Sequence, residues 1–181
     1  MEKKMKIPAK QITLTAAMLA ICIISQFFKN TSVFITGPIV NAALIIVTVF
    51  CGLLCGVILS VITPITSFFI TGSPVMAAVP LLFPCIILGN IVLVCMVYIL
   101  KNHFGKAGLP VSMVLGSICK GAVMGLLIAL IILPTFLPPK MAPMLPILQK
   151  QFSLVQFITA LIGSLYAFII IQVLSKSKVM E

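Results

Sequence analysis

No charged residue occurs between Lys29 and Lys101, and this uncharged stretch limits the possible folds more than any other feature. It consists largely of long runs of Ile, Leu, Val, Ala and Phe. A water-soluble domain of 181 residues has no interior large enough to hide that length of apolar chain. The sequence therefore predicts a polytopic membrane protein, and we expect residues 1–181 to form one integral membrane domain.

The composition and charge of the whole chain support this class. Hydrophobic residues make up 62% and charged residues 8%, against about 45–50% and about 25% in soluble domains. The net charge of +10 comes from lysines, without any arginine, and the lysines cluster at the ends of apolar segments. No basic face with interleaved aromatic residues is present. We therefore expect the lipid bilayer, and not nucleic acid, to be the partner of these charges.

The lengths of the apolar segments predict the number of spans. A membrane-spanning helix needs about 20 apolar residues, so the apolar run Ile39–Ile70 is too long for one span. Gly52 and Gly56, near its centre, allow a turn or a close helix approach. We predict an all-α membrane protein, a bundle of six transmembrane helices, over residues 11–28, 38–51, 54–71, 79–100, 109–134 and 151–174.

The lysine positions predict the orientation of the bundle. Six spans place both termini on the same side, and the positive-inside rule assigns that side to the cytoplasm. The cytoplasmic set is then Lys3, Lys4, Lys6, Lys10, Lys101, Lys106, Lys176 and Lys178, and the outside set is Lys29, Lys140 and Lys150. We expect cytoplasmic N- and C-termini in a multi-pass protein of the plasma membrane.

Two loops are expected on the outside. Residues 29–38 form a polar connection between the first two spans. Residues 134–151 connect the last two and contain five prolines, which exclude a regular helix. We expect this second loop to be stiff and partly apolar and to lie across the mouth of a cavity.

Lys120 is an ionisable residue near the middle of the fifth span. A charge at that depth costs about 2.5–3.5 kcal/mol on insertion scales, and such residues mark functional sites. The only acids in the sequence are Glu2 and Glu181, one near each end. If Lys120 is charged, we therefore expect water, backbone carbonyls or an anionic ligand, and not the chain's own side chains, to compensate it. The alternative is a neutral amine, which burial favours.

Other polar residues accompany Lys120 within the apolar segments. Asn90 lies at a similar depth in the fourth span, and Gln156 lies near the outer end of the sixth. A cavity open to the outside between the last three spans brings all three together, although Asn90 and Gln156 also fit hydrogen bonding between helices. Asn41 and Thr63 are expected to be structural.

No cofactor, metal or catalytic site is expected. The six cysteines lie within apolar runs and suit small hydrophobic packing residues. Cys51 and Cys55 lack a nearby histidine or a second cysteine pair for zinc. The sequence contains no P-loop, no acidic cluster and no H-E-x-x-H motif, so we expect no enzyme activity. The scarcity of carboxylates also disfavours proton- or sodium-coupled transport.

The chain resembles the substrate-binding S component of an energy-coupling factor (ECF) vitamin transporter. The resemblance covers nearly the whole chain. It is carried by six short helices, by small residues four apart in the first span (Ala16 and Ala20), and by the segments 88–101, 118–134 and 152–170. This resemblance implies high-affinity capture of a vitamin or related micronutrient outside the cell.

The resemblance also implies partners and a site. Such proteins associate with a transmembrane coupling subunit and two ATPase subunits, and the small-residue face of the first helix docks on the coupling subunit. That face corresponds here to Ala16 and Ala20, while the family's third alanine would fall at Ile24. The family's pocket lies in the outer half of the bundle, where Asn90, Lys120 and Gln156 are expected.

The nature of the solute is left open by the sequence. The unpaired Lys120 favours a solute with an anionic group, and Phe34 and Tyr166 are candidates for ring contacts. A pteridine, a pyrimidine, a pantothenate-like acid and a modified nucleobase are all compatible. Two alternative functions are an autonomous small secondary transporter and a ligand-free accessory membrane subunit.

Overall fold

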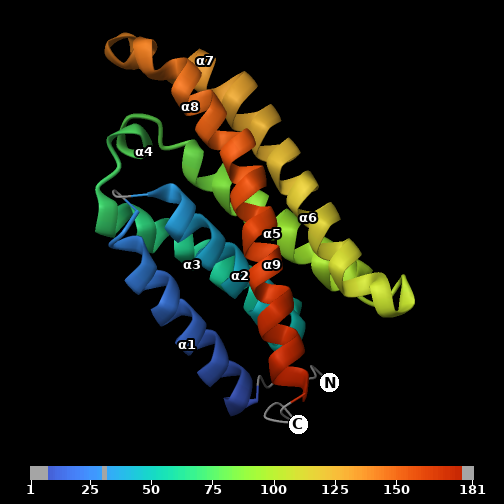
Figure 1. The fold of residues 1–181 in the computed structure, drawn as a ribbon. Coiled ribbons are helices and arrows are strands. Elements are labelled where there is room, and N and C mark those ends of the chain that lie inside the picture. Colours follow the sequence, from blue (N-terminus) through green and yellow to red (C-terminus); the bar gives the residue numbers. More distant parts are fainter. Residues whose placement is uncertain (1–7, 30–31, 177–181) are drawn as a thin grey trace, which may run out of the picture.

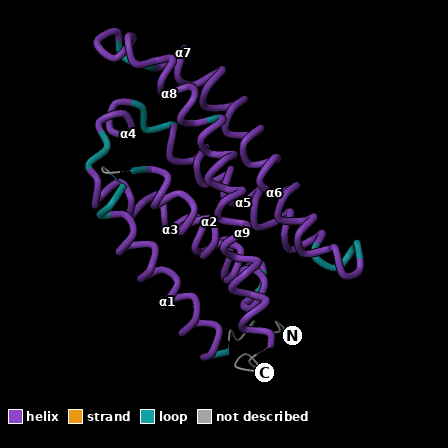
Figure 2. Tube along the Cα trace, viewed as in Figure 1, coloured by secondary structure: helices purple, strands orange, loops and turns teal. Residues whose placement is uncertain are grey.

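The computed structural model describes residues 8–29 and 32–176, and the described chain is a bundle of helices without strands (Figure 2). Six helical stretches are long and apolar enough to cross a membrane. They are α1 (Ala9–Gln26), α2 (Val33–Cys51), α3 (Leu53–Thr71), α5 (Leu82–Leu100), Gly105–Phe136 and Pro139–Lys176. The prediction of an all-α bundle of six membrane spans is confirmed.

The last two stretches are composite. The first contains η1 (Gly105–Ala107), α6 (Gly108–Met124), the π-helical segment η2 (Gly125–Ile132) and α7 (Leu133–Phe136). The second contains η3 (Pro139–Met144), α8 (Leu145–Phe152) and α9 (Leu154–Lys176). A short helix, α4 (Pro74–Ala78), lies between α3 and α5.

The helices pack in two connected groups, one of α1, α2 and α3 and the other of α5 and α6. α1, α2 and α3 contact one another, and α5 contacts α2 and α3 as well as α6. α9 contacts both α2 and α6, and so joins the two groups. The start of α1 and the end of α9 lie at the same end of the bundle, while α4, α7 and α8 lie at the other (Figure 1).

The second helix begins earlier than the sequence predicted. α2 starts at Val33, so part of the expected loop 29–38 is helical. Ser32 explains the start, because its side chain accepts a hydrogen bond from Phe34 N and so caps the first turn. Gly52 separates α2 from α3 with a φ of 88°, a conformation that glycine adopts without steric cost. The predicted break at Gly52 is therefore present.

The proline-rich segment 134–151 also differs from the expectation, because it contains regular helix. Pro146 lies in the first turn of α8, and Pro139 begins η3. The first turn has no intrahelical partner for its N–H groups, so proline is tolerated there. Pro134 instead lies in the last turn of the continuous helical stretch Gly105–Phe136. Pro139 and Pro146 thus start short helices and do not prevent them.

Two hydrophobic clusters form the core, and polar residues lie between them along the chain. One cluster includes Leu93 of α5 and Met113 of α6, and the other includes Leu82 of α5 and Met124 of α6. Asn90 lies between the clusters on α5, as Lys120 does on α6. The two halves of the core thus leave a polar layer inside the bundle.

Close contact between α2 and α9 requires Gly163. A Cβ at this position would lie 2.7 Å from Pro38 O and 3.1 Å from Ala42 N, which are backbone atoms that cannot move aside alone. We expect Gly163→Ala to destabilise the fold by about 1–3 kcal/mol through overpacking. A lower apparent melting temperature in detergent checks this.

Gly125→Ala is the matched control for this substitution. Its Cβ would meet only Ser153, at 3.3 Å from Cβ and 3.9 Å from Cα, so a small shift relieves the contact. Equal melting temperatures for the Gly163→Ala variant and the wild type would show that α2 and α9 separate without cost.

Candidate functional site

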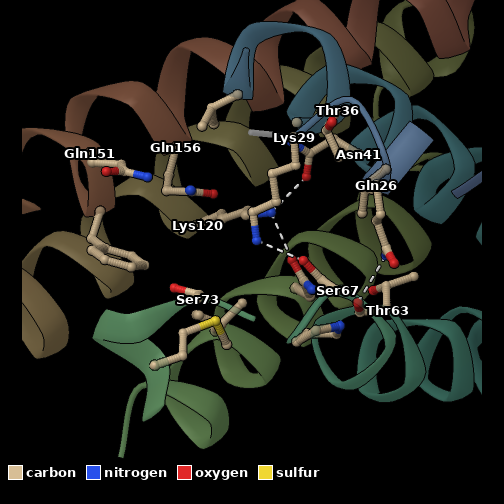
Figure 3. Close-up of a pocket in the computed structure, with 18 residues that line it drawn as sticks. Gln26, Lys29, Thr36, Asn41, Thr63, Ser67, Ser73, Lys120, Gln151 and Gln156 are labelled. Carbon is tan, nitrogen blue, oxygen red and sulfur yellow. Dashed lines mark hydrogen bonds between the residues drawn. The ribbon is translucent and has the colours of Figure 1, made fainter. Parts of the chain in front are cut away.

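A cavity of about 140 Å³ lies inside the bundle at the polar layer. Residues from α1, α2, α3, α5, α6, α8 and α9 line it, together with Met76 of α4. Figure 3 shows these side chains. The polar ones are Gln26, Lys29, Thr36, Asn41, Thr63, Ser67, Ser73, Asn90, Lys120, Gln151 and Gln156.

Lys120 is the most deeply placed charged group of the cavity. Its side chain is only 3% exposed. Nζ donates hydrogen bonds to Asn41 Oδ1 at 2.6 Å and to Asn90 Oδ1 at 2.7 Å, and so connects α6 with α2 and α5. An ammonium has three N–H groups, so one remains for a further acceptor.

Two side chains of the chain itself, Asn41 and Asn90, are partners of Lys120, which the expectation of water, backbone carbonyls or an anionic ligand did not include. They supply dipoles but no negative charge, because an amide is neutral at every physiological pH. A positive charge on Lys120 is therefore solvated by these amides and not neutralised by them.

Asn90 is held in place by a break in the hydrogen bonding of α3. Pro64 has no backbone N–H, so it cannot donate to Ser60 O four residues earlier. Asn90 Nδ2 lies 3.4 Å from that carbonyl and donates to it. This contact directs Asn90 Oδ1 toward Lys120, which shows how a proline in α3 orients a polar side chain on α5.

A second polar group lies where the end of α1 meets α3. Gln26 Nε2 donates to Thr63 O at 3.1 Å, and Lys29 Nζ donates to Ser67 Oγ at 2.6 Å. Burial lowers the pKa of Lys29 below its usual value, because partial removal from water disfavours the charged form. A bound anion would oppose this effect.

The electrostatic character of the cavity follows from its two lysines. The structure shows no ion pair for either Lys29 or Lys120, and it describes no Asp or Glu, because Glu2 and Glu181 fall outside residues 8–29 and 32–176. Positive charge without a carboxylate in a partly buried, partly apolar space attracts anions. Within the described ranges, no cluster of His, Cys, Asp or Glu that could hold a metal ion is found.

Three of the sequence-predicted site residues line this cavity and two do not. Asn90, Lys120 and Gln156 are brought together, with Gln156 on the opposite side of Lys120 from Gln26 (Figure 3). Phe34 and Tyr166 are 52% and 46% exposed and are not among the lining residues.

Several lining residues were not predicted from the sequence. Asn41 was expected to be structural, yet it both contacts Lys120 and lines the cavity. Asn41 lies in an otherwise apolar stretch, as Asn90 does, so the sequence marked both residues equally as candidates for the site. Gln26 and Lys29 gave no such indication, because polar residues at the end of a span are ordinary.

The predicted docking residues Ala16 and Ala20 do not line the polar cavity. Both are exposed on the surface of α1, next to Ala17. Larger exposed side chains such as Ile12, Ile21 and Ile24 share this apolar helix surface.

Comparison with curated proteins finds no match, and comparison with solved structures finds none either. The family model described as "ECF transporter, substrate-specific component" matches residues 10–176. The match includes all six spans except the first residue of α1. The chain, a multi-pass membrane protein with a polar cavity inside its helix bundle, therefore belongs to the family of substrate-specific components of ECF transporters.

Proposed function

We propose that this chain captures a small anionic solute, a vitamin or related micronutrient, for an ATP-powered ECF importer of the plasma membrane. The observation that carries the proposal is a cavity lined by two lysines for which the described chain supplies no carboxylate. An anionic group on the solute provides the missing charge. The protein itself binds and does not catalyse, as expected of a substrate-specific component.

Lys120 and its two asparagines form the inner part of the proposed binding site. The third N–H of Lys120 donates to the anionic group, while Asn41 and Asn90 hold the ammonium in position. Gln156, from α9, offers an amide on the opposite wall. Participation of Phe34 and Tyr166 stays a prediction, because neither lines the cavity.

The lysine distribution supports entry from outside. Lys29, Lys140 and Lys150 belong to one set of connections, and Lys101, Lys106 and Lys176 belong to the other. The positive-inside rule, with the lysines that precede residue 8 and Lys178 included, assigns the second set to the cytoplasm. Lys29, on the cavity wall, then lies toward the outer side.

Transport requires partners in this proposal. A transmembrane coupling subunit docks on the α1 surface at Ala16 and Ala20, and two ATPase subunits supply the energy. The chain contains no P-loop of its own.

A binding assay with the detergent-purified chain tests the proposal. The panel contains the carboxylate-bearing vitamins nicotinate, pantothenate and biotin, with neutral nicotinamide and cationic thiamine as comparators. We expect saturable binding of an acid, and no binding of nicotinamide or thiamine. Binding of only neutral or cationic compounds would contradict an anionic solute.

A further inference from the structure

Asn41 carries an amide nitrogen that has no hydrogen-bond partner in the part of the chain that the structure describes, although its amide oxygen accepts from Lys120. The residue is 2% exposed and lines the cavity. Within the described ranges, Gln26 Oε1 is the single side-chain nitrogen or oxygen that is both fully enclosed and without a partner. Asn41 Nδ2 is therefore not fully enclosed, and its accessible surface opens on the cavity that the residue lines.

Asn90, the other amide that contacts Lys120, has no such free donor. Its Oδ1 accepts from Lys120 Nζ at 2.7 Å, and its Nδ2 donates to Ser60 O at 3.4 Å. Both ends of this amide are thus used within the protein. Of the two asparagines that contact Lys120, only Asn41 keeps an amide nitrogen for a solute.

The position of Asn41 is fixed at both ends of its side chain. A Cβ on Gly163 would lie 2.7 Å from Asn41 Cβ, so the base of the side chain packs closely against α9. At the other end, Oδ1 accepts from Lys120 Nζ at 2.6 Å, and Figure 3 shows the two side chains directed toward each other. Nδ2 is therefore held in place before a solute binds, which lowers the entropic cost of binding.

Asn41 Nδ2 and Lys120 Nζ are neighbouring donors. The nitrogen is bonded to the same amide carbon as the oxygen that contacts Lys120, and the lysine has one N–H left. A cation beside a neutral donor matches a carboxylate, which carries one negative charge on two acceptor oxygens. A phosphate monoester carries about −1.5 to −2 charges and three acceptor oxygens, which is more than one ammonium and one amide satisfy.

From this arrangement we propose that Asn41 Nδ2 and Lys120 Nζ together bind the two oxygens of a carboxylate on the solute. Asn41 is then a binding residue as well as a support for the lysine. The inference rests on the proposed function and names the anionic group of its solute. A primary amide is rejected, because its own NH₂ group would face one of the two protein donors.

Acids and amides of one shape test this pair of donors. The probes are benzoate with benzamide and nicotinate with nicotinamide. They are small because a cavity of about 150 Å³ holds one benzene molecule, and this one is about 140 Å³. Each is titrated at millimolar concentrations in thermal unfolding of the full chain in detergent. The proteins are the wild type, Asn41→Asp, Asn90→Asp and Asn102→Asp, the last at an exposed residue outside the cavity.

We expect the acids to stabilise the wild type and the Asn102→Asp variant at concentrations about tenfold lower than the amides. Asn41→Asp and Asn90→Asp both place a carboxylate on Lys120, so both should lose acid binding. Only Asn41→Asp also turns a donor that faces the solute into an acceptor. This variant alone should therefore bind the amides, about tenfold more tightly than the wild type does. In Asn90→Asp the new oxygen faces Ser60 O instead.

A measurement on the wild type needs no folded aspartate variant. The chain has four asparagines, so labelling them with nitrogen-15 gives few side-chain amide signals, which single serine substitutions assign. Benzoate should shift the Asn41 amide protons downfield and leave those of Asn90 nearly in place. Both amides contact Lys120, so a carboxylate that bound only the lysine would shift both similarly.

Acid binding by the wild type without a gain of amide binding in a folded Asn41→Asp protein would overturn the role of Asn41 and leave the proposed function standing. Equal gains in Asn41→Asp and Asn90→Asp, or similar shifts of the Asn41 and Asn90 signals, would do the same. No stabilisation of the wild type by either acid would overturn the anionic solute itself, and the carboxylate site with it.

Discussion

Replacing Lys120 with methionine is expected to weaken solute binding about tenfold or more while the protein still inserts and folds. Methionine keeps much of the length and volume of the side chain but cannot donate a hydrogen bond. The anionic group of the solute then loses its contact with a buried ammonium, and charge interactions are stronger at a buried position than in water. Equilibrium binding of whichever labelled acid the wild type retains is the measurement.

Folding must be monitored separately in this variant. The Lys120→Met change leaves Asn41 Oδ1 and Asn90 Oδ1 without their donor, which also affects stability. Gel filtration in detergent shows whether the bundle is intact. Lys106→Met, at an exposed lysine outside the cavity, is the matched control and should bind normally. Unchanged affinity in a folded Lys120→Met protein would remove Lys120 from the site.

Tryptophan at Ala16 or Ala20 is expected to abolish assembly with the coupling subunit and to leave solute binding intact. Both alanines are exposed on α1, and neither lines the cavity. Small side chains allow helices from two membrane proteins to approach closely, and an indole ring prevents that approach. Co-purification of the ATPase subunits with a tagged chain measures assembly, and solute binding by the same preparation measures the cavity.

Val173→Trp provides the comparison for these two variants. Val173 is 61% exposed on α9, a helix that carries neither of the two alanines. The same bulk there should leave assembly unchanged. Normal co-purification of the ATPases with both Ala16→Trp and Ala20→Trp would exclude this surface of α1 from docking.

The sequence predicted the bundle because hydropathy and length determine membrane spans with few alternatives. The sequence also predicted that Asn90, Lys120 and Gln156 line one cavity, because polar side chains inside apolar helices must face one another or a cavity. The start of α2 was missed because the polar residues of segment 29–38 were interpreted as a loop, whereas the cap at Ser32 begins the helix earlier. The helices of segment 134–151 were missed because a proline count ignores the position of each proline in its turn.

The parts of the site that the sequence did not predict depend on contacts between distant segments. Gln26 and Lys29 belong to the cavity because the end of α1 packs on Thr63 and Ser67 of α3. Asn41 became a site residue because α2 passes close enough to α6 for its amide to meet Lys120. Neither packing arrangement has a local sequence pattern, so only the three-dimensional structure reveals them.

The most direct test of the account is native mass spectrometry of the detergent-purified chain, expressed alone in rich medium. We predict that the wild-type protein carries a small molecule, and that collisional release yields an acid of vitamin size. Such a result would establish capture without the partner subunits. A protein that is empty after purification, and stays empty when the vitamin panel is added, would contradict a solute-capture function and favour an autonomous transporter or an accessory subunit.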